Sequence, residues 1–142
     1  MIFKFFKDNW DYFFALFMAF PVIFILCLLD IKKFELHWVS FNVLMFHILL
    51  LPILEEVIFR WGVQDTLANF FNKKVVGLSF ANIITAFLFG LAHMRYQPVS
   101  WSLSVIPVAI VLGFFYEKKK SLWAPIVLHI FYNGVFFFSM VD

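Results

Sequence analysis

Charged residues are scarce in this chain. They make up 14% of its 142 residues, against roughly 25% in a typical soluble domain. Hydrophobic residues make up 64%, and the 23 phenylalanines are too many for a small water-soluble core. Lipid tails, in contrast, can surround side chains of this kind. The shortage of charge therefore excludes an ordinary soluble domain and predicts an integral membrane protein.

Cysteine and net charge are also low, and each excludes a class of function. The single cysteine, Cys27, cannot form an intrachain disulfide, and its apolar neighbours offer no metal-ligand spacing. A formal net charge of +2 is too small to indicate a nucleic-acid partner. The length predicts a single membrane domain over residues 1–142, with the lipid bilayer as its surroundings.

Five apolar segments predict an all-α membrane protein of about five transmembrane helices. No small-residue cleavage site follows the first segment, so we expect a retained helix there instead of a signal peptide. Residues 61–74 mix apolar and polar side chains, which predicts a short helix lying in the membrane interface. The expected spans are residues 12–29, 38–59, 75–94, 99–116 and 122–141.

Basic residues are distributed unevenly between the two ends of these spans. Cytoplasmic loops of membrane proteins carry an excess of Lys and Arg. We therefore expect a multi-pass protein of a bacterial inner membrane with a cytoplasmic N-terminus. Eight basic residues would share the side of the N-terminus, namely Lys4, Lys7, Arg60, Lys73, Lys74, Lys118, Lys119 and Lys120, and three would lie opposite, namely Lys32, Lys33 and Arg95.

A charged stretch, Glu-Glu-Val-Ile-Phe-Arg at 55–60, ends the second apolar segment. Glu56 and Arg60 are four residues apart, so they lie on one helical face and are expected to form a structural ion pair. Glu55 is turned away by about 100° and has no basic residue three or four positions later. It is expected to be a partly desolvated carboxylate that can act as a base. The alternative is a cluster of interfacial charges at a helix end.

Further polar residues lie in the later apolar segments. His129 and Asn133 are four residues apart and share one helical face, while His93 ends the third segment. A single histidine in a membrane helix is often only a hydrogen-bonded core residue, but polar groups on three spans together indicate a functional site. Asn82 and Thr85 are lesser candidates.

Two kinds of chemistry fit these residues. In amide hydrolysis, a buried carboxylate takes a proton from water while one histidine assists, and the second histidine and the asparagine donate hydrogen bonds to the oxyanion. In the alternative, Glu55, His93 and His129 bind zinc and leave one position for water. The His-Glu-x-x-His motif of common zinc proteases is absent from the sequence.

Three motifs in order resemble the CPBP intramembrane proteases, which include the CAAX prenyl proteases and the Abi proteins. They are Glu-Glu-x-x-x-Arg at 55–60, Phe-x-x-x-His at 89–93 and His-x-x-x-Asn at 129–133. The resemblance covers a core of about residues 55–134. Two departures are that Trp61 follows the motif arginine where the family usually has glycine, and that few helices precede the first motif.

The resemblance implies an intramembrane endopeptidase that cleaves a membrane-anchored peptide, with its active site in a cavity inside the bundle. Glu55 would activate water with His93 as its partner, His129 and Asn133 would stabilise the oxyanion, and Glu56 and Arg60 would support the site. We favour a metal-free mechanism because asparagine is a poor zinc ligand, with zinc as the alternative cofactor. The alternative hypotheses are a proton-coupled transporter, which would tolerate aspartate at position 55, and a catalytically silent assembly subunit.

One geometric difficulty accompanies this hypothesis. With the spans as counted, Glu55 lies near the cytoplasmic end of the second helix and His93 near the outer end of the third. They can approach only if the third helix begins later, near residues 78–82, or if the helices are broken around a water-filled cavity. The sequence by itself names neither the substrate nor the oligomeric state.

Overall fold

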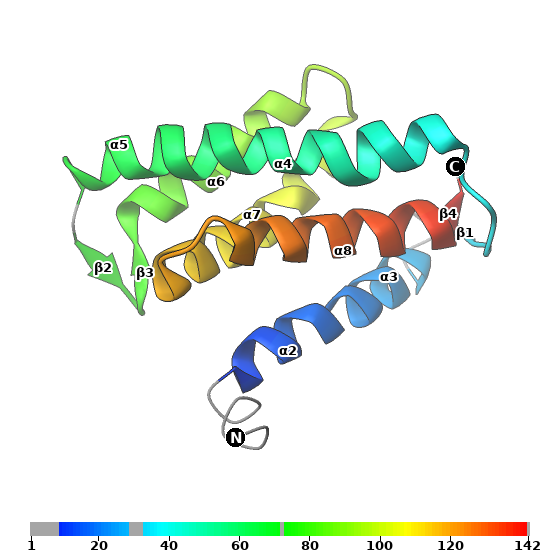
Figure 1. Ribbon diagram of the computed structural model, residues 1–142, viewed down its shortest axis with the longest axis horizontal. Helices are drawn as coiled ribbons and strands as arrows, with labels where there is room; N and C mark the ends of the chain where they lie inside the picture. The colour runs from blue at the N-terminus through cyan, green and yellow to red at the C-terminus, as the bar shows by residue number, and fades with distance from the viewer. Residues whose placement is uncertain (1–8, 29–32, 72, 142) are drawn as a thin grey trace. The chain divides into compact units, whose positions relative to one another are not determined.

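The computed structural model describes residues 9–28, 33–71 and 73–141 and is mostly helical (Figure 1). The chain divides into two compact units. We call Ile53–Val127 the central unit, and the two terminal segments, Met1–Pro52 with Leu128–Asp142, the terminal unit. Each unit is described separately below.

The terminal unit contains the first expected span, which forms two helices, α2 and α3. The break falls at Met18, three residues before Pro21. A proline ring clashes with the carbonyl four residues earlier, here that of Phe17, so the break lies where Pro21 requires it. The other elements of this unit are η1, a π-helix at Val43–Leu50, and most of α8, together with strands β1 and β4. The bounds are α2 Trp10–Phe17, α3 Ala19–Leu28, β1 Lys33–Phe34, α8 Trp123–Ser139 and β4 Met140–Val141.

Strands β1 and β4 pair antiparallel, Lys33 with Val141 and Phe34 with Met140. The hydroxyl of Tyr132 on α8 also donates to the Ala15 carbonyl on α2 at 2.6 Å. These contacts join the N-terminal elements of the terminal unit to its C-terminal helix.

The central unit begins within α4 and is built around an antiparallel pair of long helices, α6 and α7. A two-stranded hairpin, β2 and β3, precedes α6 (Figure 1). Its core is formed by Ala86, Phe89 and Ala109, with partly buried apolar side chains of η2 and α7 packed against them. The bounds are α4 Leu51–Glu56, η2 (a π-helix) Val57–Gln64, α5 Asp65–Ala68, β2 Lys74–Val75, β3 Leu78–Ser79, α6 Phe80–His93 and α7 Val99–Lys119.

The hairpin explains where the third helix starts. Val76 and Gly77 both have positive φ, 52° and 82°, as a two-residue turn between right-handedly twisted strands requires. Ser79 then caps α6, because its hydroxyl accepts a hydrogen bond from the Asn82 amide at 2.9 Å. The helix therefore begins at Phe80 and not at residue 75. A later start of this kind is one of the two ways by which Glu55 and His93 were expected to approach each other.

The helix expected over residues 61–74 is present in part. Helical residues of η2 and α5 extend to Ala68, and strand β2 begins at Lys74. The two short strand pairs were also not expected in an all-α protein. Among the described residues, α7 is the one helix long and apolar enough to cross a membrane, while α6 and α8 are apolar but shorter. The count of five spans stays a prediction.

At Gly90, α6 packs closely against α7. A Cβ atom there would lie 2.6 Å from Ile106 Cγ1 and 3.1 Å from the Ser102 carbonyl oxygen. Gly62 is the matched control, because its Cβ would meet only one backbone atom, at 3.8 Å.

We expect Gly90→Ala to destabilise the protein by about 1–3 kcal/mol, the usual cost of overpacking. Gly62→Ala should instead be neutral or stabilise by up to about 1 kcal/mol, since alanine favours helix. Denaturation of the purified protein in detergent measures both changes. Equal effects at the two positions would contradict the close packing of α6 on α7.

Candidate functional site

The expected ion pair is present in the central unit. Arg60 Nε donates to Glu56 Oε2 at 2.7 Å, and both side chains are fully buried. Glu56 ends α4 and Arg60 lies in η2, so a single stretch of helical chain supplies both charges. Removing two charges from water costs several kcal/mol per ion, so such a pair needs further hydrogen bonds around it.

Gln64 supplies the next hydrogen bonds. Its Oε1 accepts from Arg60 Nη1 at 3.2 Å, while its Nε2 donates to the Gly113 carbonyl at 3.2 Å and to Glu117 Oε1 at 2.8 Å. Glu117 also accepts a hydrogen bond from the Ser79 hydroxyl. A polar chain therefore runs from Glu56 through η2 to the C-terminal part of α7 and to β3.

Asn82 has a structural role at the same place. Its Nδ2 donates to the Ile110 carbonyl at 2.9 Å, which joins α6 to α7. A Cβ atom on Gly113 would lie 2.0 Å from Asn82 Oδ1 and 2.7 Å from Gln64 Oε1. Glycine at position 113 thus lets both amide side chains reach the backbone of α7. Thr85, the other lesser candidate, is fully buried on α6.

Phe89 connects the first two motifs. Its ring meets the ring of Phe59 edge-on, with centroids 4.9 Å apart, and the Arg60 guanidinium lies 6.0 Å from its centroid. The centroid of the Phe89 ring also lies 4.5 Å from that of the His93 imidazole. The phenylalanine of the Phe-x-x-x-His motif thus lies close to both the motif arginine and the motif histidine.

His93 is the last residue of α6 and is half-buried. Its Nδ1 lies 2.9 Å from the Phe89 carbonyl oxygen, which can only accept a hydrogen bond. Nδ1 therefore carries the proton in the neutral ring, and Nε2 presents a lone pair. This is the tautomer that a general base or a metal ligand requires. Glu55, also half-buried, lies on α4 in the same unit.

Asn133 lies on α8 in the terminal unit, where its Nδ2 donates to the His47 carbonyl at 2.9 Å. The reason lies in η1 and Pro52. In the π-helix each amide donates to the carbonyl five residues earlier, as the Leu51 amide does to the Phe46 carbonyl. The His47 carbonyl would therefore accept from the amide of residue 52. Residue 52 is proline, which has no amide hydrogen. Asn133 supplies that missing donor and keeps its second N–H.

His129 lies one turn earlier on α8 and is buried. It and Asn133 belong to the terminal unit, whereas Glu55, Arg60 and His93 belong to the central unit. That these residues of the two units form one site is therefore still a prediction. Among the described residues no group of three His, Cys, Asp or Glu side chains forms a metal site. The alternative zinc set combines residues of both units, and zinc dependence stays untested.

Comparison with known proteins places the chain in a family. Residues 36–135 match the family described as type II CAAX prenyl endopeptidase Rce1-like, a range that contains all three motifs. The chain belongs to this family. The resemblance inferred from the motifs is thereby confirmed, and the family together with α7 indicates an integral membrane protein.

Two bacterial proteins are similar to this chain. YdiL of Bacillus subtilis (strain 168), named as a membrane peptidase, is 32% identical over 85 residues, which are 58% of this chain and 30% of YdiL. MroQ of Staphylococcus aureus (strain USA300), named as a membrane-embedded CAAX protease, is 30% identical over 86 residues, 58% of this chain and 33% of MroQ. The alignments thus cover about a third of each relative. No solved structure matches the chain significantly.

Sequence reasoning missed Gln64, Ser79 and Glu117. Gln64 could have been found, because it follows Arg60 by four residues and so extends the face that carries Glu56. Ser79 and Glu117 offered no such signal, since they reach the chain of hydrogen bonds from other elements.

We expect Arg60→Ala to lower the free energy of unfolding by about 3–5 kcal/mol, because the buried charge of Glu56 would lose the opposite charge of Arg60. The double change Glu56→Gln with Arg60→Gln should recover most of the loss. Yield and denaturation midpoint in detergent measure the effect, and Arg95→Ala, at an exposed arginine, is the control. An unchanged denaturation midpoint in Arg60→Ala would mean that the ion pair contributes nothing to the stability of the fold.

Gln64→Ala removes a buried amide that makes three hydrogen bonds and leaves polar partners unsatisfied. We expect it to cost about 1–3 kcal/mol of stability. Tyr116→Phe is the control, since it removes one surface hydrogen bond, from the Tyr116 hydroxyl on α7 to Asp65, the first residue of α5. If both variants denature alike, the polar chain through Gln64 holds the elements together no better than this surface bond.

Proposed function

We propose that the chain is an intramembrane endopeptidase that hydrolyses a peptide bond of a membrane-anchored substrate. The observation that carries the proposal is the arrangement of the first two motifs in one unit, where Phe89 lies close to both Arg60 and His93 and its carbonyl fixes the His93 tautomer. Membership of a family described as CAAX prenyl endopeptidases supports the same activity. We also propose that the protein lies in a bacterial inner membrane with its N-terminus in the cytoplasm.

In the proposed reaction Glu55 takes a proton from a water molecule, and His93 Nε2 accepts the second hydrogen bond of that water. The water oxygen attacks the peptide carbonyl carbon and forms a tetrahedral oxyanion. His129 and the second N–H of Asn133 donate hydrogen bonds to it. The C–N bond then breaks, and the proton held by Glu55 passes to the leaving amine.

Each supporting group has a definite part in this proposal. The Glu56–Arg60–Gln64 chain fixes the helical stretch that carries Glu55, so the carboxylate is held by neighbours which do not themselves react. Among the described residues of the same unit, four buried polar atoms have no protein partner, and buried groups of this kind usually bind ordered water. They are Arg60 Nη2, Asn82 Oδ1, Thr85 Oγ1 and Ser102 Oγ. A polar interior that admits water suits hydrolysis.

Glu55→Gln preserves the shape of the side chain but cannot accept the proton. We expect it to lower the cleavage rate of a membrane-anchored peptide by about 10²-fold or more, since a general base usually contributes 10²–10⁴-fold. His93→Ala should lose a similar factor, and Asn133→Ala about 10²–10³-fold. Glu35→Gln, at an exposed carboxylate, is the control and should be fully active.

The metal-free mechanism is tested in the same samples by measuring metal content and the effect of a chelator. We expect activity without bound metal. Stoichiometric zinc, with activity lost on chelation and regained on zinc addition, would instead assign Glu55, His93 and His129 as ligands. Denaturation midpoints equal to that of the parent protein must accompany each loss of rate, because Asn133→Ala also removes the hydrogen bond to His47.

A further inference from the structure

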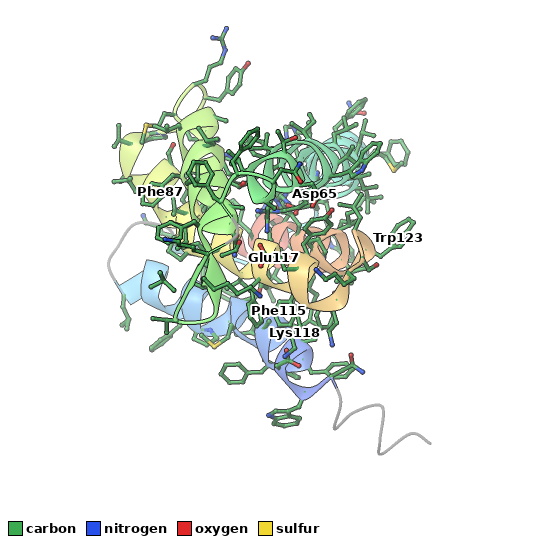
Figure 2. The ribbon with its side chains drawn as sticks, turned by 90° about the vertical axis from the view of Figure 1, so that its left-hand side faces the viewer. Asp65, Phe87, Phe115, Glu117, Lys118 and Trp123 are labelled. Atoms are coloured by element: carbon green, nitrogen blue, oxygen red, sulfur yellow. The ribbon has the colours of Figure 1, made fainter. Side chains whose placement is uncertain are left out.

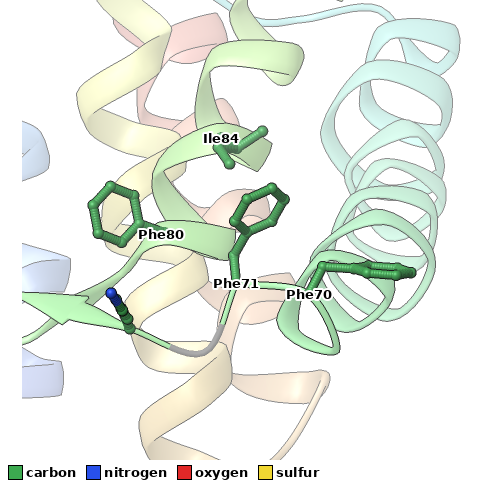
Figure 3. Close-up of a pocket in the computed structure, with 5 residues that line it drawn as sticks. Phe70, Phe71, Phe80 and Ile84 are labelled. Carbon is green, nitrogen blue, oxygen red and sulfur yellow. The ribbon is translucent and has the colours of Figure 1, made fainter.

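A groove of about 370 Å³ lies on the central unit, where the chain passes from α5 through β2 and β3 into α6 (Figure 3). Its volume falls in the range of about 300–1,000 Å³ that small-molecule sites occupy. Four of the five lining side chains are apolar and the fifth is basic. The lining residues are Phe70, Phe71, Lys73, Phe80 and Ile84.

The apolar walls are open to the surroundings of the protein. Phe70 is 75% exposed, Phe71 44% and Phe80 40%. In Figure 3 the ring of Phe71 stands between those of Phe80 and Phe70 in the view, with Ile84 above it. In an integral membrane protein such a surface faces lipid, and an acyl chain is the apolar ligand that lipid offers.

The neighbouring hairpin indicates the depth at which this groove lies. Val76 is 97% exposed and has a φ of 52°, an unfavourable conformation for a β-branched residue. The strained turn thus directs an apolar side chain outward, beside the basic residues Lys73 and Lys74. Apolar and basic side chains together on an exposed segment are typical of the boundary between acyl chains and headgroups.

The charge at this end of the central unit is positive. Lys118–Lys120 end α7, and the hydrogen bond from Ser79 to Glu117 holds that end of α7 against β3. Figure 2 shows Asp65, Glu117 and Lys118 at this end. Both acids already accept hydrogen bonds, Asp65 from Tyr116 and Glu117 from Gln64 and Ser79. Lys73, which lines the groove, and the neighbouring Lys74 favour an anionic headgroup over a neutral one.

We propose that the groove binds one acyl chain of an anionic phospholipid, with the lipid phosphate on the ammonium group of Lys73. The chain would contact the four apolar walls, and the phosphate would lie on the side of the basic hairpin. The bound lipid would bridge the segment after α5, which continues the helical stretch of Arg60, to α6, which carries His93. Binding to the folded protein alone should also stabilise it.

The test uses the full chain purified in a neutral detergent and a phosphatidylglycerol that carries a photoactivatable diazirine in its acyl chain. After irradiation, mass spectrometry identifies the labelled peptides. We expect labelling centred on residues 70–84, displaced by unlabelled phosphatidylglycerol at a concentration at least about fivefold lower than by phosphatidylcholine with the same chains. Inorganic phosphate should not displace it, because it lacks the chain.

Matched variants separate the groove from general charge and general hydrophobicity. Lys73→Gln should weaken phosphatidylglycerol binding about fivefold, whereas Lys74→Gln, which removes the same charge from the next residue, should have a smaller effect. Phe80→Ala should reduce labelling by the diazirine lipid, whereas Phe87→Ala, at an exposed phenylalanine of α6 outside the groove, should not. The thermal midpoint of each variant without added lipid shows that it is folded.

Three outcomes would overturn the proposal. Labelling spread evenly over the apolar helices would mean that only general lipid contact occurs. Equal effects of Lys73→Gln and Lys74→Gln would indicate diffuse electrostatic attraction without a site. Displacement by inorganic phosphate at the concentration that phosphatidylglycerol requires would show a phosphate site that takes no acyl chain. None of these outcomes depends on peptidase activity.

Discussion

The buried ion pair between Glu56 and Arg60 is the interaction around which the central unit is built. Two charges with no solvent exposure are unfavourable unless their remaining donors and acceptors are satisfied. Gln64 meets part of that requirement and in turn binds Gly113 and Glu117 of α7. Helix η2 is thereby fixed to α7, and through Ser79 also to the start of α6. Satisfying the buried arginine thus joins three elements of the unit, in addition to the apolar core around Phe89.

The same construction prepares the candidate site for chemistry. Phe89 packs against Phe59 and lies beside Arg60, and its own carbonyl accepts the Nδ1 proton of His93. One residue thus sets both the position and the tautomer of the histidine. In the terminal unit, Asn133 replaces the backbone donor that Pro52 lacks, and one N–H of its amide can do so while the other remains for a ligand.

Hairpin β2–β3 and the groove beside it lie outside the three motifs, yet they join the elements that carry two of them. The groove walls come from the segment after α5 and from the first turns of α6. A lipid bound there would contact both elements without touching a reacting group. Lipid composition would in that case act on the stability of the site and not on its chemistry.

The sequence by itself determined the membrane class, the position of α7 and the Glu56–Arg60 pair, because composition and a spacing of four residues act locally. Its three motifs also indicated the family. Only the tertiary structure decided that α6 begins at Phe80, that Gln64 reaches Glu117 across 53 positions, and that Asn133 reaches His47 across 86. Contacts at such separations depend on which helices pack together and on where proline removes a hydrogen-bond donor. The residue pattern of a single segment does not predict them.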